Sequence, residues 1–187
     1  MEQQYCYKYP RPALTTDALL WGLDFASQTV SVLLIKRKNP PFKDMYALPG
    51  GFVDMDETVE QCAARELEEE TGLKDIPLLQ MHTFSRPDRD PRGRTVSVVF
   101  FSMIDRQLYN PVAGDDAAAL AWHDLLSLPP LAFDHKEIID FSVRFVCQNL
   151  LFGTYSRAIG LFAPFARLIE TFGKENLFNV IHDYGVE

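Results

Sequence analysis

The stretch GGFVDMDETVEQCAARELEEETGL, residues 50–73, constrains the fold more than any other part of the chain. Its residues 56–71 have the composition of a helix, and Gly72 is a typical signal for a helix end. Glu66 and three consecutive glutamates at 68–70 precede this glycine. Each acidic group there costs about 0.3–1 kcal/mol, because the negative end of the helix macrodipole already lies at that end. We therefore expect a positive partner outside the helix to offset these charges.

The helical phase separates the glutamates into two groups. At 100° per residue, Glu66, Glu69 and Glu70 share an arc of about 100°. Glu68 points nearly opposite to Glu66, toward solvent. The alternative for all of these glutamates is an ordinary solvated acidic face of the helix. Clustered carboxylates repel one another, so at least one should have a raised pKa. Hard divalent cations such as Mg²⁺ relieve this repulsion and prefer oxygen ligands. The apolar side of the helix, which should face the core, consists of Val59, Ala63, Ala64 and Leu67.

The same stretch resembles the Nudix box, G-x5-E-x7-R-E-U-x-E-E-x-G-U, in which U is a bulky aliphatic residue. The resemblance implies an α+β protein, namely an α/β/α sandwich around a mixed β-sheet, in which the box forms a loop–helix–loop. It also implies hydrolysis of a nucleoside diphosphate linked to another moiety, with one to three Mg²⁺ or Mn²⁺ ions as cofactor. The fixed positions of the box are all present, as Gly51, Glu57, Arg65, Glu66, Leu67, Glu69, Glu70, Gly72 and Leu73.

Carried over position by position, the resemblance assigns roles within the box. Arg65 lies four residues before Glu69 and is expected to orient a carboxylate through a charge-assisted pair. Glu57, at the helix start where the dipole favours an acid, is expected to be mainly architectural within the catalytic set. Glu66 and Glu69 belong to the same catalytic set. The predicted metal ligands are Glu66, Glu69, Glu70 and the backbone carbonyl of Gly50.

Two later segments offer candidates for completing the site. Members of the family often place an acid on a loop after the box, and here GDDAAA at 114–119 offers Asp115 and Asp116. Asp116 is the predicted general base, with a turn or helix N-cap as the alternative. His135 either belongs to the wall of the site or begins a helix that Asp134 caps.

The loop FSRPDRDPRGR, residues 84–94, is the expected substrate-binding segment. Its alternative is a solvated hairpin loop, but its arginines, Arg89 included, suit a phosphate or a ribose hydroxyl. With PRPALTTDALL upstream and LAFDH at 131–135, it resembles the Nudix branch of ADP-ribose pyrophosphatases and NrtR-type regulators of NAD metabolism. ADP-ribose, cleaved to AMP and ribose 5-phosphate, is therefore the expected substrate, with NADH or nucleoside triphosphates as alternatives. The predicted contacts are Phe84, which would support or stack on a base, with Arg86, Arg92 and Arg94.

The remaining pattern predicts strands first and helices last, as in a mixed α+β sheet flanked by helices. We expect residues 10–147 to form the Nudix domain and 148–187 a helical extension that packs on the domain or on a second subunit. Predicted strands cover 14–22, 29–37, 78–85, 95–104 and 118–125, with a short broken strand in YALPGGFVD. Predicted helices cover 134–152, 155–172, interrupted near Pro164, and 175–185.

Charge and cysteine content limit the expected partners and location. The net charge of −8 argues against nucleic-acid binding. Residues 148–187 carry three basic and four acidic residues, whereas a DNA-reading module needs a basic surface. These charges count against the competing hypothesis, a DNA-binding regulator of the NrtR type. A homodimer is plausible because related enzymes often build the substrate site across a dimer. Without a signal peptide, a bilayer-spanning run or a disulfide-like cysteine spacing, we expect no membrane contact and a cytoplasmic location.

Overall fold

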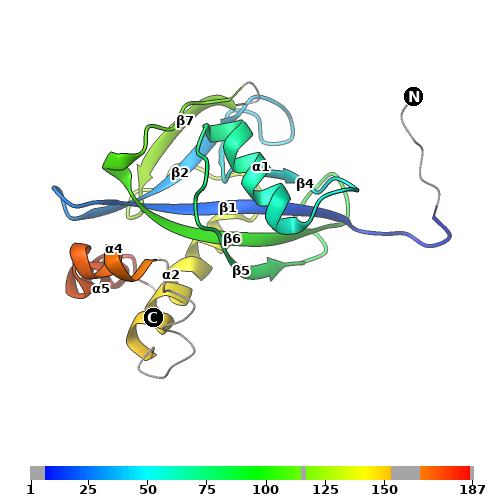
Figure 1. Cartoon of the computed structure of the whole chain (residues 1–187). Coiled ribbons are helices and arrows are strands. Elements are labelled where there is room, and N and C mark those ends of the chain that lie inside the picture. Colours follow the sequence, from blue (N-terminus) through cyan, green and yellow to red (C-terminus); the bar gives the residue numbers. More distant parts are fainter. Residues whose placement is uncertain (1–6, 115–116, 153–164, 186–187) are drawn as a thin grey trace.

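A seven-stranded mixed sheet forms the centre of the computed structural model (Figure 1). The structure describes residues 7–114, 117–152 and 165–185. Its sheet is mixed because β1 pairs in parallel with β6, whereas the other strand pairs are antiparallel. The strands are β1 (Ala13–Asp24), β2 (Thr29–Arg37), β3 (Tyr46–Ala47), β4 (Gly50–Phe52), β5 (Leu79–Phe84), β6 (Thr95–Asp105) and β7 (Ala117–Asp124).

Both faces of the sheet are apolar, since side chains of a strand point alternately to its two sides. On β1, Leu19 and Trp21 are buried against the C-terminal helices, whereas Leu20 lies in a second cluster with Leu67 of α1. Figure 1 shows α1 on one side of β1 and β6, and α2, α4 and α5 on the other. This is the predicted α/β/α sandwich. The helices are α1 (Val59–Thr71), α2 (His135–Phe152), α4 (Ala166–Phe172) and α5 (Lys174–Asp183), with a 3₁₀ turn, η1 (Arg106–Leu108), after β6.

Local capping sets both ends of α1. Thr58 accepts a hydrogen bond from the Gln61 backbone N–H, and the Gln61 side chain accepts one from the Thr58 backbone, which is a capping box. The helix therefore begins three residues later than the predicted residue 56. It ends as predicted, at Gly72, whose φ of 71° is a left-handed conformation that glycine adopts at little cost. Ala64, expected in the core, is exposed instead.

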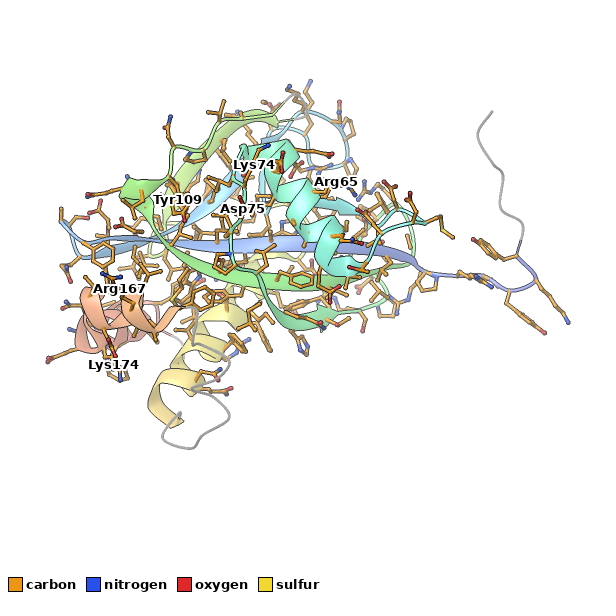
Figure 2. The ribbon with its side chains drawn as sticks, viewed as in Figure 1. Arg65, Lys74, Asp75, Tyr109, Arg167 and Lys174 are labelled. Carbon is orange, nitrogen blue, oxygen red and sulfur yellow. The ribbon has the colours of Figure 1, made fainter. Side chains whose placement is uncertain are left out.

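The C-terminal helices pack on the same core as the sheet. Ile169 of α4 and Leu177 of α5 are buried in one cluster with Leu19. Of the predicted helix at 155–172, residues 153–164 lie outside the described part of the chain. The division of the chain near residue 147 stays a prediction, and α2 runs across it. In Figure 2, Arg167 and Lys174 lie on α4 and α5, across the sheet from Arg65. No helix in the described ranges has both the length and the apolar character to cross a bilayer.

Candidate active site

A cavity of about 400 Å³ opens where β1, β4 and α1 meet the loop before β6 and the segment before α2. This volume lies within the usual range for small-ligand sites. Its lining includes two carboxylates of α1, Glu66 and Glu70, which we call the acidic end, and two guanidinium groups, Arg37 and Arg92, which we call the basic end. The cavity therefore offers groups that can bind a cation together with groups that can bind an anion.

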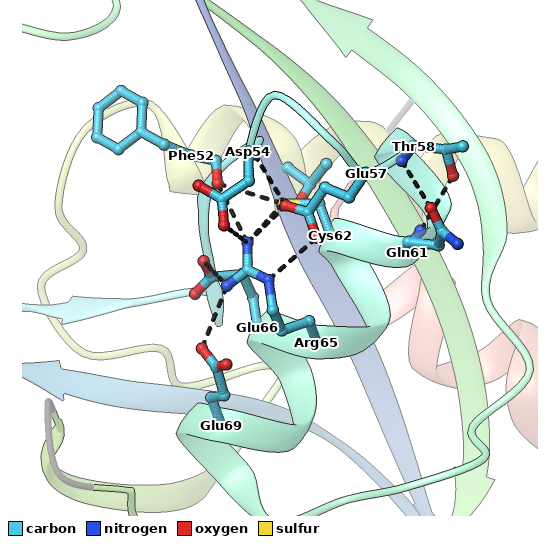
Figure 3. A network of polar contacts seen from close by, with 10 residues as sticks. Phe52, Asp54, Glu57, Thr58, Gln61, Cys62, Arg65, Glu66 and Glu69 are labelled. Atoms are coloured by element: carbon cyan, nitrogen blue, oxygen red, sulfur yellow. Dashed lines mark hydrogen bonds and ion pairs between the residues drawn. The ribbon is translucent and has the colours of Figure 1, made fainter. Parts of the chain in front are cut away.

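Arg65 is the centre of the polar network at the acidic end (Figure 3). Its Nε and Nη2 donate to both carboxylate oxygens of Glu57, at 3.0 and 2.6 Å. Its Nη1 donates to Glu66 at 2.7 Å and to Glu69 at 3.2 Å. The hydrogen bonds with Glu57 raise the pKa of Arg65 and lower the pKa of Glu57 to about 2. Both groups are thus charged at neutral pH, and Glu57 holds the guanidinium that orients Glu66.

Glu66 and Glu70 meet the two glycines that precede the box helix. A Cβ on Gly51 would lie 2.2 Å from Oε1 of Glu66, so only glycine leaves room for this carboxylate. The backbone N–H of Gly50 donates to Oε2 of Glu70 at 2.9 Å. Burial raises the pKa of Glu66 in spite of the nearby Arg65. Glu66 is thus an acid whose charge is only partly compensated, and a cation in the cavity would stabilise it.

The other two glutamates of the run do not line this cavity. Glu69 is mostly exposed and contacts Arg65. Glu68 pairs with Lys74 at 2.6 Å, outside the cavity. In the described residues, no three His, Cys, Asp or Glu side chains already form a metal cluster. The oxygen donors at Glu66, Glu70 and Gly50 nevertheless suit a hard divalent cation, whereas Glu69 would have to turn away from Arg65 to join them.

Two guanidinium groups and two aromatic rings form the basic end. Arg92 lies over the rings of Phe52 and Phe133, at 5.2 and 5.4 Å, and Arg37 lies 4.9 Å from the Phe133 ring. Asp90 holds Arg92 by hydrogen bonds from Nε and Nη2. Burial and the neighbouring Arg92 lower the pKa of Arg37. An anionic ligand placed here would relieve the repulsion between the two cations.

Asp17, Arg89 and His135 line the cavity as part of a buried ion-pair cluster, and we call this part of the lining the floor. Sequence reasoning named Arg89 and His135 but missed Asp17. Arg89 donates to both carboxylate oxygens of Asp134, at 2.9 and 2.8 Å. The same guanidinium lies 3.7 Å from Asp17, and His135 lies beside Asp17 at 3.6 Å. α2 begins at His135, directly after Asp134, whose side chain binds Arg89. Capping by Asp134 stays a prediction. The available signal was Asp17 itself, an acid within the apolar strand LTTDALLWG.

A profile of the NUDIX domain family matches residues 17–141, which include both ends of this cavity. The chain belongs to the Nudix family. It is 46% identical to the ADP-ribose pyrophosphatase of Methanocaldococcus jannaschii over 139 residues, which are 73% of this chain and 76% of that protein. It is 32% identical to the ADPR-responsive transcriptional repressor NtrR of Acinetobacter baylyi over 183 residues, 96% of this chain and 70% of the repressor.

Solved Nudix structures agree with this fold. A MutT/nudix family protein from Enterococcus faecalis superimposes with a TM-score of 0.74 at 29% identity, covering 98% of this chain and 85% of that one. The NUDIX domain of Shewanella oneidensis NrtR complexed with ADP ribose superimposes with a TM-score of 0.67 at 31% identity, covering 74% and 90%. The predicted branch of ADP-ribose pyrophosphatases and NrtR-type proteins is thus confirmed by these relatives.

The predicted substrate contacts of the Nudix cavity divide between three places. Arg92 lines the cavity, but Phe84 and Arg86 line a smaller one of about 240 Å³ between β5 and α2. Phe84 packs against Phe141 there because its position on β5 turns the ring toward α2. Arg94 lines neither cavity and donates to the carbonyl of Thr95 at 3.0 Å. Sequence spacing thus located the loop but could not resolve which of its arginines enters the site.

The predicted general base, Asp116, and its neighbour Asp115 lie outside the described residues. Gly114, the last described residue before them, donates its backbone N–H to the Glu70 carbonyl at 3.1 Å. The backbone N–H of Val112 likewise donates to the Thr71 carbonyl, at 2.8 Å. The start of this loop is therefore attached to the end of the Nudix helix. The role of Asp116 stays a prediction.

Cys62 should be chemically inert in the folded Nudix protein. Burial raises the pKa of its thiol to about 11, so roughly one thiol in a thousand is ionised at pH 8. We expect iodoacetamide at pH 8 to label Cys62 only after the protein is unfolded in urea, as read by peptide mass spectrometry. Cys147, which is only partly buried, is the internal comparison. Labelling of native Cys62 as fast as Cys147 would contradict its burial.

Proposed function

We propose that this Nudix protein is a metal-dependent pyrophosphohydrolase that cleaves ADP-ribose to AMP and ribose 5-phosphate. The observation that carries the proposal is that a single cavity is lined both by Glu66 and Glu70 and by Arg37 and Arg92. A diphosphate needs both, because its charge must be neutralised and its ends must be held in place. The 46% identical ADP-ribose pyrophosphatase supports this choice of substrate.

The residues of the chain divide the work between cation binding and substrate positioning. Glu66, Glu70 and the Gly50 carbonyl would hold Mg²⁺ or Mn²⁺, and Glu69 would join them after leaving Arg65. A cation held there would neutralise the diphosphate and would lower the pKa of the attacking water. Arg65, fixed by Glu57, keeps the Glu66 carboxylate in one orientation. The general base is assigned to Asp116.

Substrate binding is assigned mainly to the basic end. Arg37 and Arg92 would hold the anionic part of the substrate. The rings of Phe52 and Phe133, which lie beside Arg92, would offer apolar faces for a base. Phe84, Arg86 and Arg94 are left out of this assignment because they do not line the cavity. Arg37 takes their place as a predicted substrate contact.

A substrate panel tests the proposal. We expect ADP-ribose to have the highest kcat/KM in Mg²⁺, ahead of NADH, a sugar nucleotide and the nucleoside triphosphates, in a phosphate-coupled assay. Chelation by EDTA should remove turnover, and added Mg²⁺ should restore it. Metal-dependent turnover that is fastest with a triphosphate would support the assignment as a Nudix hydrolase but would contradict ADP-ribose as its substrate.

A second candidate is an ADP-ribose sensor that acts as a transcriptional regulator. The relative named as a repressor aligns with 96% of this chain, which favours it. The complete box favours the enzyme, and so does the composition of residues 148–187, with three basic and four acidic residues.

For this reason we propose that the chain does not bind nucleic acid. We also propose that it acts in the cytoplasm and forms a homodimer. Light scattering and a DNA mobility-shift assay test two of these points.

A further inference from the structure

The floor of the cavity holds a carboxylate and an imidazole that the proposed hydrolysis does not use. Asp17 belongs to β1 and His135 is the first residue of α2, and both are less than a tenth exposed. Oδ1 of Asp17 and Nε2 of His135 are 3.6 Å apart. This separation is too long for a direct hydrogen bond, so the two groups leave hydrogen-bonding capacity toward the cavity that they both line.

The hydrogen bond from Leu48 defines which nitrogen of His135 carries the proton. The backbone N–H of Leu48 donates to Nδ1 at 2.8 Å, so Nδ1 is the acceptor and the proton of the neutral ring lies on Nε2. Burial lowers the pKa of His135 and favours this neutral form. His135 therefore presents a fixed N–H donor beside Asp17.

Asp17 presents the complementary acceptor. Its Oδ2 accepts a hydrogen bond from Ser97 Oγ at 2.5 Å and lies 3.7 Å from Nη2 of Arg89. Among the described residues, none donates a hydrogen bond to Oδ1. A Cβ on Gly50 would lie 3.0 Å from this oxygen, so the glycine keeps the space beside it open. One carboxylate oxygen is thus held by the protein while the other is available to a ligand.

A hydroxyl group satisfies this pair because it donates one hydrogen bond and accepts another. A phosphate oxygen does not, since it only accepts and the Asp17 carboxylate repels it. We propose that Asp17 and His135 together bind one ribose hydroxyl of the substrate. This inference rests on the proposed function, because it places the sugar in the cavity that binds the diphosphate. The hydroxyl can come from the nucleoside ribose or from the terminal ribose.

Binding measurements with deoxy analogues test the pair. The ligands are ADP-ribose and analogues that lack one hydroxyl of either ribose, titrated calorimetrically in EDTA so that no turnover occurs. Asp17→Asn and His135→Gln are compared with wild type and with Asp24→Asn, a control at the far end of β1. We expect Asp17→Asn to weaken ADP-ribose binding about tenfold, because a charged acceptor becomes neutral. With the one analogue that lacks the bound hydroxyl, the Kd values of Asp17→Asn and wild type should differ by about twofold or less. Asp24→Asn should leave the Kd of every ligand unchanged.

Each result of this comparison supports or overturns the inference. Loss of the penalty with one analogue supports it and identifies the sugar. An equal penalty with ADP-ribose and all analogues would show a purely structural role and overturn it. If Asp17→Asn does not fold, as judged by circular dichroism, His135→Gln gives the same comparison. Wild-type affinity that is insensitive to every hydroxyl would also overturn it. Turnover in Mg²⁺, measured separately, tests the proposed hydrolase, so the two can fail independently.

Discussion

Glu66→Gln and Glu70→Gln will each lower kcat/KM for ADP-ribose by about 10²- to 10³-fold, the effect of losing a few kcal/mol of charge stabilisation. Both carboxylates line the cavity, and Glu70 also accepts a hydrogen bond from the Gly50 backbone. Neutral amides keep the size of the side chains but remove the charge that a divalent cation needs. Steady-state kinetics across a Mg²⁺ titration measures the effect.

Glu68→Gln is the matched control for these two variants. Glu68 belongs to the same run but pairs with Lys74 outside the cavity. We expect it to change kcat/KM by about twofold or less, as for other surface substitutions. Glu69→Gln should fall between the extremes, because Glu69 is held by Arg65 in this arrangement. Equal losses of kcat/KM at Glu66, Glu68 and Glu70 would mean that helical phase does not decide which glutamates act in the cavity.

Arg89→Met will lower the free energy of unfolding by about 3–5 kcal/mol, which for a protein of this size lowers Tm by roughly 6–20 °C. Arg89 is buried and donates two hydrogen bonds to the buried Asp134, with Asp17 a further 3.7 Å contact. Its removal leaves two buried carboxylates with less compensation, which is the costly way to break an ion pair. Urea and thermal unfolding followed by circular dichroism measure the change.

Two further variants test whether the loss of stability comes from breaking a buried ion pair or from removing any arginine of this loop. Arg86→Met removes an exposed arginine from the same loop and should change stability by about 0.5 kcal/mol or less. Arg89→Met combined with Asp134→Leu should recover part of the loss, because it replaces the ion pair with apolar groups. A loss below about 1 kcal/mol for Arg89→Met alone would show that water reaches the cluster.

The acidic half of the site could be predicted because its geometry is local. Glu66, Glu69 and Glu70 lie within two turns of one helix, so residue spacing fixes their phase. Even there, spacing could not show that Arg65 holds Glu69 outside the cavity. That depends on Glu57 and Phe52, which contact Arg65 from the preceding loop and β4.

Arg89, Arg92 and His135 were named from the sequence, but the other members of the floor and the basic end could not be predicted because they depend on long-range packing. Asp17 meets Ser97 only through the parallel pairing of β1 with β6, and His135 reaches Leu48 across 87 positions. Phe84 was expected to contact a base because it lies beside an arginine-rich loop, but the structure places its side chain in the hydrophobic core. The register of a strand decides such choices, and a shift of one residue would reverse them.

Product analysis of ADP-ribose treated with the 187-residue chain tests the central claim most directly. In Mg²⁺ the account predicts equal amounts of AMP and ribose 5-phosphate, identified by chromatography and mass spectrometry. Neither product should form in EDTA, and Glu66→Gln should form both products about 10²- to 10³-fold more slowly than wild type. Binding of ADP-ribose without cleavage in Mg²⁺ would contradict the account and identify the protein as a sensor.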